Sequence, residues 1–361
     1  MLKRQKMSLF ELDNLPDEII LKVMRYLETR DVLRCGQVSN RIRAISRDEL
    51  LWQKINLANS TPLGYYEKRP TSYATDFLEM ILNNGCKYLN LHGTKISGAL
   101  KLKKPSQLRY LDLSGTRSSQ EILKEILDSC YSLEKLSLSH CYLNRNHINS
   151  VCHQNGQTLK VLDLQGCKGL IPEFIQDIVK FCVELREFNF AVIFMKEESF
   201  NFIMNNITTK IEKIRLGSHG YQTVVKDSQM KTLVTRCNKI SALSLCAGYD
   251  TLTKDTFTNI IENLHSTLEE LDIVCHDATE EFVKENNYLE LTKLQKLKRF
   301  HYDCYITPAH VETLKLHLPN LNTDNAHGLN IARNWPQQLG IWEIQEKQFL
   351  TRTEPEAVRP K

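Results

Sequence analysis

Apolar side chains recur along most of the chain in a six-residue pattern, with leucine-type residues at its first, fourth and sixth positions. Eight copies match in full: LRYLDL from Leu108, LEKLSL from Leu133, LKVLDL from Leu159, LREFNF from Leu185, IEKIRL from Ile211, ISALSL from Ile240, LEELDI from Leu268 and LKRFHY from Leu297. A shorter copy, CKYLNL, begins at Cys86, and WQKINL at Trp52 is a degenerate opening copy. The alternation in the last three positions predicts a short strand with two apolar side chains on one face.

The spacing of the copies indicates the architecture. Their fourth positions lie 25, 26, 26, 26, 29, 28 and 29 residues apart, and they are Leu111, Leu136, Leu162, Phe188, Ile214, Leu243, Leu271 and Phe300. This period is typical of leucine-rich repeats, which recur every ~20–29 residues. Several of the intervening stretches have the i, i+3, i+4, i+7 spacing of an amphipathic helix. We therefore predict an α/β solenoid over 86–320, with parallel strands on its concave face and helices on its convex face.

A short helical segment precedes the repeats. Pro16 at the first helical position, followed by Asp17 and Glu18, predicts a helix start. Ile19, Val23 and Leu27 continue that helix, and two further helices and a closing Leu51–Trp52 pair follow. Three short helices cannot bury so much apolar surface among themselves. The surplus predicts a partner protein, and the alternative is that it packs against the first repeats.

The residues LPDEIILKVMRYLETRDVLRCGQVSNRIRAISRDELLW resemble the F-box. Ser39 and Ile42 depart from this pattern, because the family carries Cys and Trp there. The resemblance implies docking on the Skp-type adaptor of a cullin-based ubiquitin ligase. The residues expected to bind the adaptor are Leu15, Pro16, Glu18, Ile19, Val23, Leu27, Leu33 and Val38.

The segment after the last repeat resembles the tail of the S-phase kinase-associated F-box protein family. The shared pattern is carried by Pro319, Leu321, His327, Ile331, Ala332, Arg333, Ile341, Trp342 and Ile344. The resemblance implies that the tail folds back across the concave face. It also implies a cyclin-kinase regulatory subunit as an accessory partner and a phosphorylated protein substrate. Gly328 stands where the family carries an aromatic residue, which leaves the accessory contact open.

The candidate functional residues indicate binding of another molecule and not catalysis. The chain contains no phosphate-binding glycine loop, no HExxH and no GxSxG. On the expected concave face acids and bases are mixed, which favours a protein or peptide ligand over nucleic acid. The net charge of +4 argues neither for nor against nucleic acid. The residues expected to bind a substrate are Asp112, Asp163, Lys213, Arg215, Asp272, Arg299, His301 and His327.

The eleven cysteines contain no CxxC pair. Those beside the repeat pattern, such as Cys141 and Cys182, fit small buried packing positions, whereas a metal site combining Cys141, His147 and Cys152 matches no zinc spacing. We expect no metal and no cofactor. The beginning of the chain lacks a secretory signal, and the longest apolar run, 190–195, is too short for a membrane span. We therefore expect reduced thiols and a protein of the nucleus and cytoplasm.

These observations predict a non-catalytic substrate-recognition subunit of a Skp/cullin/F-box ubiquitin ligase. The expected divisions are an N-terminal tail at 1–13, the F-box at 14–57, a linker with an irregular first repeat at 58–85, the repeats at 86–320 and the tail at 321–361. The alternative function is an interaction scaffold without ubiquitin transfer. The F-box discriminates between the two, because a scaffold has no need of an exposed Leu15–Pro16 edge.

Overall fold

The repeat pattern forms one curved parallel sheet. The computed structural model describes residues 15–27, 29–58, 72–102, 105–190, 195–217, 225–246, 253–274, 287–301 and 307–323. Within these residues ten strands pair side by side. They are β1 (Lys54–Asn56), β3 (Tyr88–Asn90), β5 (Tyr110–Asp112), β6 (Lys135–Ser137), β7 (Val161–Asp163), β8 (Glu187–Asn189), β9 (Lys213–Gly217), β10 (Ala242–Cys246), β11 (Glu270–Val274) and β12 (Arg299–His301).

The predicted register is confirmed. Leu111 lies opposite Leu136, which lies opposite Leu162, and the same pairing of fourth positions continues to Phe300. The degenerate WQKINL copy also joins the sheet, because Ile55 pairs with Leu89. A slip of one residue would turn each buried side chain to the opposite face, so burial of one face fixes the register.

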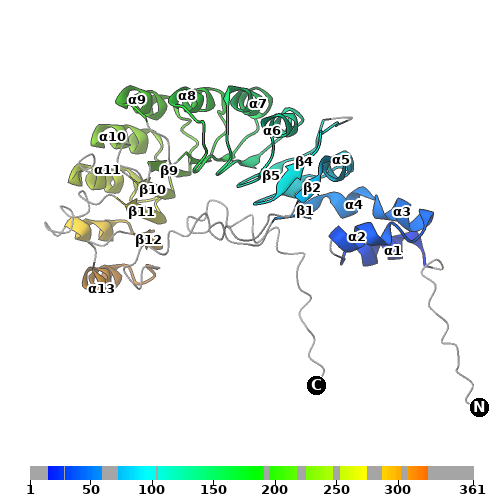
Figure 1. The fold of residues 1–361 in the computed structure, drawn as a ribbon. Helices are drawn as coiled ribbons and strands as arrows, with labels where there is room; N and C mark the ends of the chain where they lie inside the picture. Colours follow the sequence, from blue (N-terminus) through cyan, green and yellow to red (C-terminus); the bar gives the residue numbers. More distant parts are fainter. Residues whose placement is uncertain are drawn as a thin grey trace, which may run out of the picture.

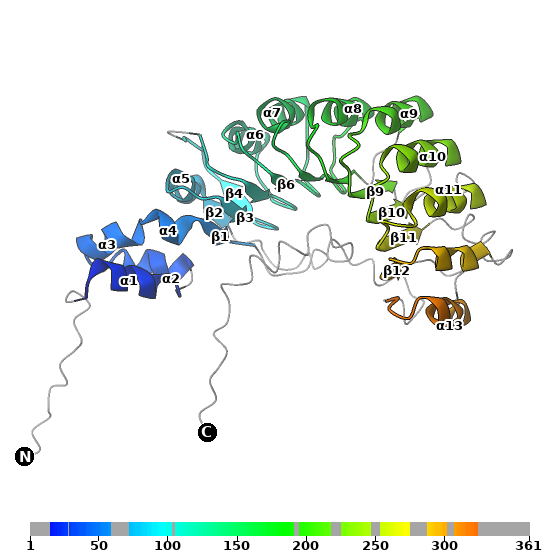
Figure 2. The same cartoon turned by 180° about the vertical axis from the view of Figure 1, so that it is seen from behind.

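Helices cover the convex side of the sheet, and the strands line the concave side (Figures 1 and 2). This confirms the predicted α/β solenoid, and the stretches with helical spacing form α6, α8 and α11. The helical segments of the repeats are α6 (Gln120–Asp128), α7 (Arg145–Asn155), α8 (Pro172–Phe181), α9 (Glu197–Asn206), α10 (Asp227–Arg236), α11 (Lys254–Leu264), η2 (Asn287–Lys293) and α13 (Pro308–His317).

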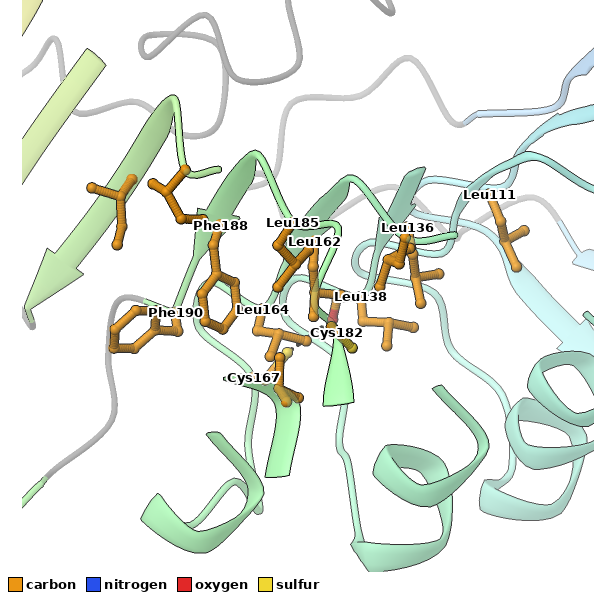
Figure 3. Packing of buried hydrophobic residues seen from close by; sticks show 14 of the residues in the cluster. Leu111, Leu136, Leu138, Leu162, Leu164, Cys167, Cys182, Leu185, Phe188 and Phe190 are labelled. Carbon is orange, nitrogen blue, oxygen red and sulfur yellow. Dashed lines mark hydrogen bonds between the residues drawn. The ribbon is translucent and has the colours of Figure 1, made fainter. Parts of the chain in front are cut away.

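The core is a continuous ladder of leucine-type side chains between the sheet and the helices. Figure 3 shows Leu136, Leu162 and Phe188 stacked from one strand to the next, with Leu138, Leu164 and Phe190 beside them. Leu136, Leu162 and Phe188 are fully buried. Each fully buried side chain of this kind contributes about 1.5–3 kcal/mol of transfer free energy, so no repeat is stable without its neighbours.

The cysteines of the repeats occupy packing positions, as predicted. Cys141 Sγ donates to the Leu113 carbonyl at 3.1 Å and Cys167 Sγ to the Leu138 carbonyl at 2.9 Å, so each thiol ties its turn to the preceding repeat. Cys130, Cys182 and Cys237 are also buried. Burial raises the pKa of the Cys130 thiol to about 11, which keeps it protonated and unreactive.

Four helical segments precede the repeats: α1 (Asp17–Met24), α2 (Thr29–Cys35), α3 (Asn40–Ser46) and α4 (Glu49–Trp52). Pro16 is the cap before α1 and not its first residue, a one-residue correction. The short α4 was not predicted as a helix; the Asp48 side chain caps it by accepting from Leu50 N–H. Trp52 is buried and donates to the Ser46 carbonyl at 2.8 Å.

The two departures from the F-box pattern are accommodated in α3. Ser39 caps the helix, because its hydroxyl accepts a hydrogen bond from Ile42 N–H at 3.1 Å. Ile42 itself lies in the core. Ser39 thus has a hydrogen-bond partner, and Ile42 contributes to the apolar core.

The stretch at 58–85, expected to be a linker with an irregular first repeat, contains regular structure in its described part. Strand β2 (Ser72–Ala74) pairs with β4 (Lys95–Ser97) in a small second sheet, and α5 (Thr75–Asn83) follows β2. Leu78, Ile81 and Leu82 of α5 are buried. Their helical spacing was available in the sequence, but no LxxLxL copy precedes it in this stretch.

Candidate functional site

The N-terminal helices leave large apolar side chains in solvent. Ile20 and Met24 point into the core, whereas Ile19 and Val23, on another face of α1, expose 45% and 48% of their surface. Val38, just before α3, exposes 75%. The apolar surplus predicted from the sequence is therefore divided, with one part packed inside and the other left as candidate binding surface.

Ion pairing and hydrogen bonding hold α1 and α3 together at the start of α1. The Arg41 guanidinium donates to Asp17 Oδ1 at 2.8 Å from Nε, and to the Leu15 carbonyl at 2.6 Å from Nη2. Because both acceptors flank Pro16, the Leu15–Pro16 edge is fixed relative to α3. Leu15 itself is only partly exposed and packs against the core.

The residues expected to bind the adaptor thus fall into two groups. Pro16, Glu18, Ile19, Val23 and Val38 are exposed. Leu15, Leu27 and Leu33 are partly buried against the core. Sequence reasoning missed Tyr26 and Leu50, which are also exposed. Tyr26 lies in the turn that follows α1, where its N–H donates to the Val23 carbonyl at 3.0 Å.

Across the first four strands of the concave face runs an array of rings and cations. Tyr88 and Tyr110 lie opposite each other on β3 and β5 and stack with their ring centroids 4.4 Å apart. Lys54 Nζ lies 5.1 Å from the Tyr88 ring centroid, and Lys135 Nζ lies 5.2 Å from that of Tyr110. Both distances are within the range of cation–π attraction.

This array was not among the residues predicted to bind a substrate, although its members share one position of the repeat pattern. Lys54 and Tyr88 fall in the two incomplete opening copies, which made the shared position harder to recognise. Burial raises the pKa of Tyr110 and lowers the pKa of Lys135. Both shifts indicate that the array is partly withdrawn from water.

Further along the same row, acids and bases neutralise each other. Lys213 Nζ lies 3.9 Å from Glu187 Oε1, and Arg299 Nη2 lies 2.6 Å from Glu270 Oε1. Burial raises the pKa of the Glu187 carboxyl, against the opposing effect of Lys213. Of the predicted substrate-binding residues, Lys213 and Arg299 therefore have acidic partners within the sheet.

The neighbouring row, formed by the residue between the last two apolar positions, is more buried than the sequence suggested. We expected these side chains to point into solvent, but Asp163 and Asp272 are buried, as are Ser137, Asn189 and Ser244. The reason is that neighbouring strands lie only about 4.8 Å apart, so polar side chains of one row bond to each other. Ser137 Oγ donates to Asp163 Oδ2 at 3.3 Å, and Ser244 Oγ to Asp272 Oδ2 at 2.8 Å.

The two buried aspartates of this row differ in their electrostatics. Burial raises the pKa of Asp163 to about 6, with a further contribution from Asp112. Burial acts to raise the pKa of Asp272, but the hydrogen bond and charge of His301, whose Nδ1 lies 2.7 Å from Asp272 Oδ1, together with Arg215 and Ser244, outweigh burial, and the net pKa is lowered. Arg215 lies between them and donates to Gln165 Oε1 at 3.3 Å.

The remaining predicted residues are placed as follows. Asp112 accepts from Ser114 N–H at 2.8 Å, and His327 lies outside the described residues, as does the rest of 324–361.

Over the described ranges, no three His, Cys, Asp or Glu side chains are arranged to hold a metal ion. The helices in that part of the chain include none long and apolar enough to cross a membrane.

A helical domain joined to a curved leucine-rich-repeat solenoid defines the class of protein. Comparison with protein families agrees: residues 12–58 match the F-box-like family, and residues 76–348 match the family described as the SKP2 LRR domain. The second match covers well over half of the chain. The chain belongs to the SKP2-type F-box/leucine-rich-repeat family.

Individual relatives are more distant. The chain is 22% identical to F-box/LRR-repeat protein 5 of Xenopus tropicalis over 197 residues, which is 46% of this chain and 30% of that protein. It thus spans less than a third of that relative's length. Among solved structures, an internalin (inlF) from Listeria monocytogenes aligns with a TM-score of 0.43 and 16% identity, covering 86% of this chain and 92% of the internalin.

Proposed function

We propose that this protein is the substrate-recognition subunit of a Skp/cullin/F-box ubiquitin ligase. The observation that carries the proposal is a set of exposed apolar side chains in the F-box region. Ile19 and Val23 lie on α1, and Val38 lies between α2 and α3. A folded domain that exposes such side chains while its own core is filled gains by covering them with a partner. The F-box match supports a Skp-type adaptor as that partner.

The test is co-purification with a Skp-type adaptor. Covering two half-exposed side chains contributes about 1–2 kcal/mol each, so the double variant Ile19→Ser, Val23→Ser should lose adaptor binding by tenfold or more. A matched control is Leu316→Ser on α13, which removes an apolar side chain that is 81% exposed far from the F-box. If the double variant co-purifies with the adaptor as well as the control does, the adaptor proposal is wrong.

We propose that the concave face holds the substrate, and that the substrate is a protein. The array of Lys54, Tyr88, Tyr110 and Lys135 supports this, because rings and partly desolvated cations are typical of protein-binding hot spots. The family resemblance suggests a phosphorylated cell-cycle regulator, which would place the protein in the nucleus as well as the cytoplasm. It also suggests a cyclin-kinase regulatory subunit as an accessory.

Substrates can be sought by affinity purification after proteasome inhibition, with and without phosphatase treatment. A substrate of the proposed kind should accumulate on the parent protein, be lost after phosphatase treatment and be lost from Tyr110→Ala. Arg186→Ala is the matched control, because Arg186 lies at the edge of the sheet in a surface ion pair with Glu212. Proteins that bind Tyr110→Ala and the parent equally would not be substrates of this face.

In this proposal the chain contributes binding, and ubiquitin transfer is performed by enzymes bound to the cullin. The alternative is an interaction scaffold that never meets a ligase. A reconstituted mixture of adaptor, cullin, ubiquitin enzymes and this chain discriminates between the two. The receptor should enter the cullin complex through the adaptor, whereas a scaffold should remain separate.

A further inference from the structure

A row of basic and aromatic side chains lies along the edge of the solenoid where the strands run into their loops. The row is formed by the fourth residue after the last apolar position of four successive repeats, and its members are Lys95, Arg117, Tyr142 and Lys168. All four side chains are exposed. We call this row the basic edge; it lies outside the F-box helices and outside the two rows of the concave face.

Backbone hydrogen bonds fix the basic edge. Lys95 and Arg117 are partners in a parallel bridge, in which Arg117 N–H donates to the Thr94 carbonyl at 2.8 Å and Ile96 N–H to the Arg117 carbonyl at 2.9 Å. Tyr142 and Lys168, in the third and fourth of these repeats, form the equivalent bridge. Three steps of about 4.8 Å between neighbouring strands give about 14 Å, the length of about four residues of extended chain.

The turn before each member of the row has the same conformation in all four repeats. Gly93, Gly115 and Gly166 have φ of 66°, 63° and 64°, and His140 adopts φ of 60° at the equivalent position. A left-handed conformation is costly for histidine. Its presence here keeps the third turn equivalent to the other three, and therefore keeps Tyr142 in line with its neighbours.

The positive charge of the basic edge is not neutralised within the described part of the chain. Lys95 and Arg117 lie directly opposite each other, an arrangement that destabilises a sheet when the charges are alike. No described carboxylate lies within ion-pair distance of Lys95, Arg117 or Lys168, whereas at the opposite edge of the sheet Lys160 pairs with Glu134 at 2.9 Å. Glu121, the closest acid in sequence to Arg117, bonds instead to Ser119 and to its own backbone, which lowers its pKa.

We infer that the basic edge binds an acidic, extended segment of a partner protein. Carboxylates of the segment would pair with the three cations, and the Tyr142 phenol would donate a hydrogen bond while its ring covers an aliphatic stem. Nucleic acid fits less well, since its affinity grows with the number of phosphates neutralised, the row offers only three cations, and the net charge of the chain is only +4. The inference goes beyond the proposed function, because it adds a second binding surface to the receptor.

The experiment uses the full chain and a fluorescein-labelled peptide of ten glutamates, with fluorescence anisotropy as the readout. The variant is the triple substitution Lys95→Ser, Arg117→Ser, Lys168→Ser. Its matched control is Lys231→Ser, Lys239→Ser, Lys296→Ser, which removes the same charge from three exposed lysines elsewhere. Thermal unfolding of both variants confirms that they remain folded.

We expect the edge variant to bind the peptide about tenfold more weakly at low salt, because each exposed ion pair contributes modestly and three act together. The control should lose less than about twofold. Equal losses in the two variants would show a general charge effect and overturn the inference, as would no detectable binding by the parent. A labelled single-stranded DNA of ten nucleotides is measured in the same way. If the parent binds the DNA more tightly than the peptide, and the edge variant loses this binding, the inference is overturned and the ligand of the basic edge is nucleic acid.

Discussion

Asn155, at the end of α7, joins two successive repeats through a pair of buried hydrogen bonds. Its Oδ1 accepts from Leu133 N–H at 2.9 Å, and its Nδ2 donates to the Cys130 carbonyl at 2.9 Å. The side chain and both main-chain partners lie out of contact with solvent. The connection from α6 to β6 therefore has its polar groups satisfied by a side chain from the following repeat.

The substitution Asn155→Ala removes both partners at once. A buried main-chain group left without a hydrogen bond costs about 1–3 kcal/mol, so the two groups together should lower the free energy of unfolding by about 2–6 kcal/mol. A single surface asparagine to alanine change has no such cost. We expect the variant to be severely destabilised in the repeats around β6.

The assay is urea unfolding of the purified chain followed by far-ultraviolet circular dichroism. Asn146→Ala is the matched control, because Asn146 lies on the same helix with its side chain exposed. The control should unfold within about 0.5 kcal/mol of the parent. If Asn155→Ala and Asn146→Ala have the same midpoint, the two buried bonds do not stabilise the junction and the reasoning is refuted.

Three further predictions use the same stability assay. Leu162→Asp places an unpaired charge in the leucine ladder and should lower the free energy of unfolding by several kcal/mol. A urea midpoint equal to that of the parent would contradict the register. Burial raises the folded-state pKa of Asp163 to about 6 from 3.8, so as the pH rises the unfolded state releases the proton first. This residue should therefore make the free energy of unfolding fall as the pH rises from about 4 to about 6. Asp163→Asn should remove that fall, and the same pH dependence in the variant and the parent would contradict the prediction. Ser39→Ala should lower stability by about 1 kcal/mol through loss of the α3 cap, with exposed Ser97→Ala as its control.

The strands were predictable from the sequence, because the period and the alternation act together. Ten segments share a pattern that buries the same face, and only one register satisfies all of them, as the Leu111–Leu136–Leu162 pairing illustrates. The degenerate copy at Trp52 has the same register, because its strand β1 pairs with β3 and Ile55 lies opposite Leu89. Each repeat thus adds evidence for the next.

Local features that depend on contacts between repeats were not predictable. The pattern identifies Asp163 as a residue between two apolar positions, but not that its buried carboxylate accepts hydrogen bonds from Ser137 Oγ on the preceding strand and from Gln165 N–H. Similarly, the Tyr88–Tyr110 stack depends on the pairing of β3 with β5, two strands that belong to copies of unequal quality. Helix α5 lies between the two incomplete copies at Trp52 and Cys86, in the stretch predicted as a linker with an irregular first repeat, and the spacing of these copies is too long to fix where its helix begins and ends.

The concave face separates stability from recognition row by row. Asp163 and Asp272 share a row in which polar side chains are bonded to each other and removed from solvent, so substitutions there act on stability first. Tyr110 and Lys135 lie in the neighbouring row and are half-exposed, so substitutions at these two positions leave the leucine ladder intact. A solenoid of this kind can therefore change its ligand by exchanging residues at one position of each repeat. The row that begins at Lys54 is the one that we propose binds the ligand, and Asp163 and Asp272 in the row beside it are buried and hydrogen-bonded.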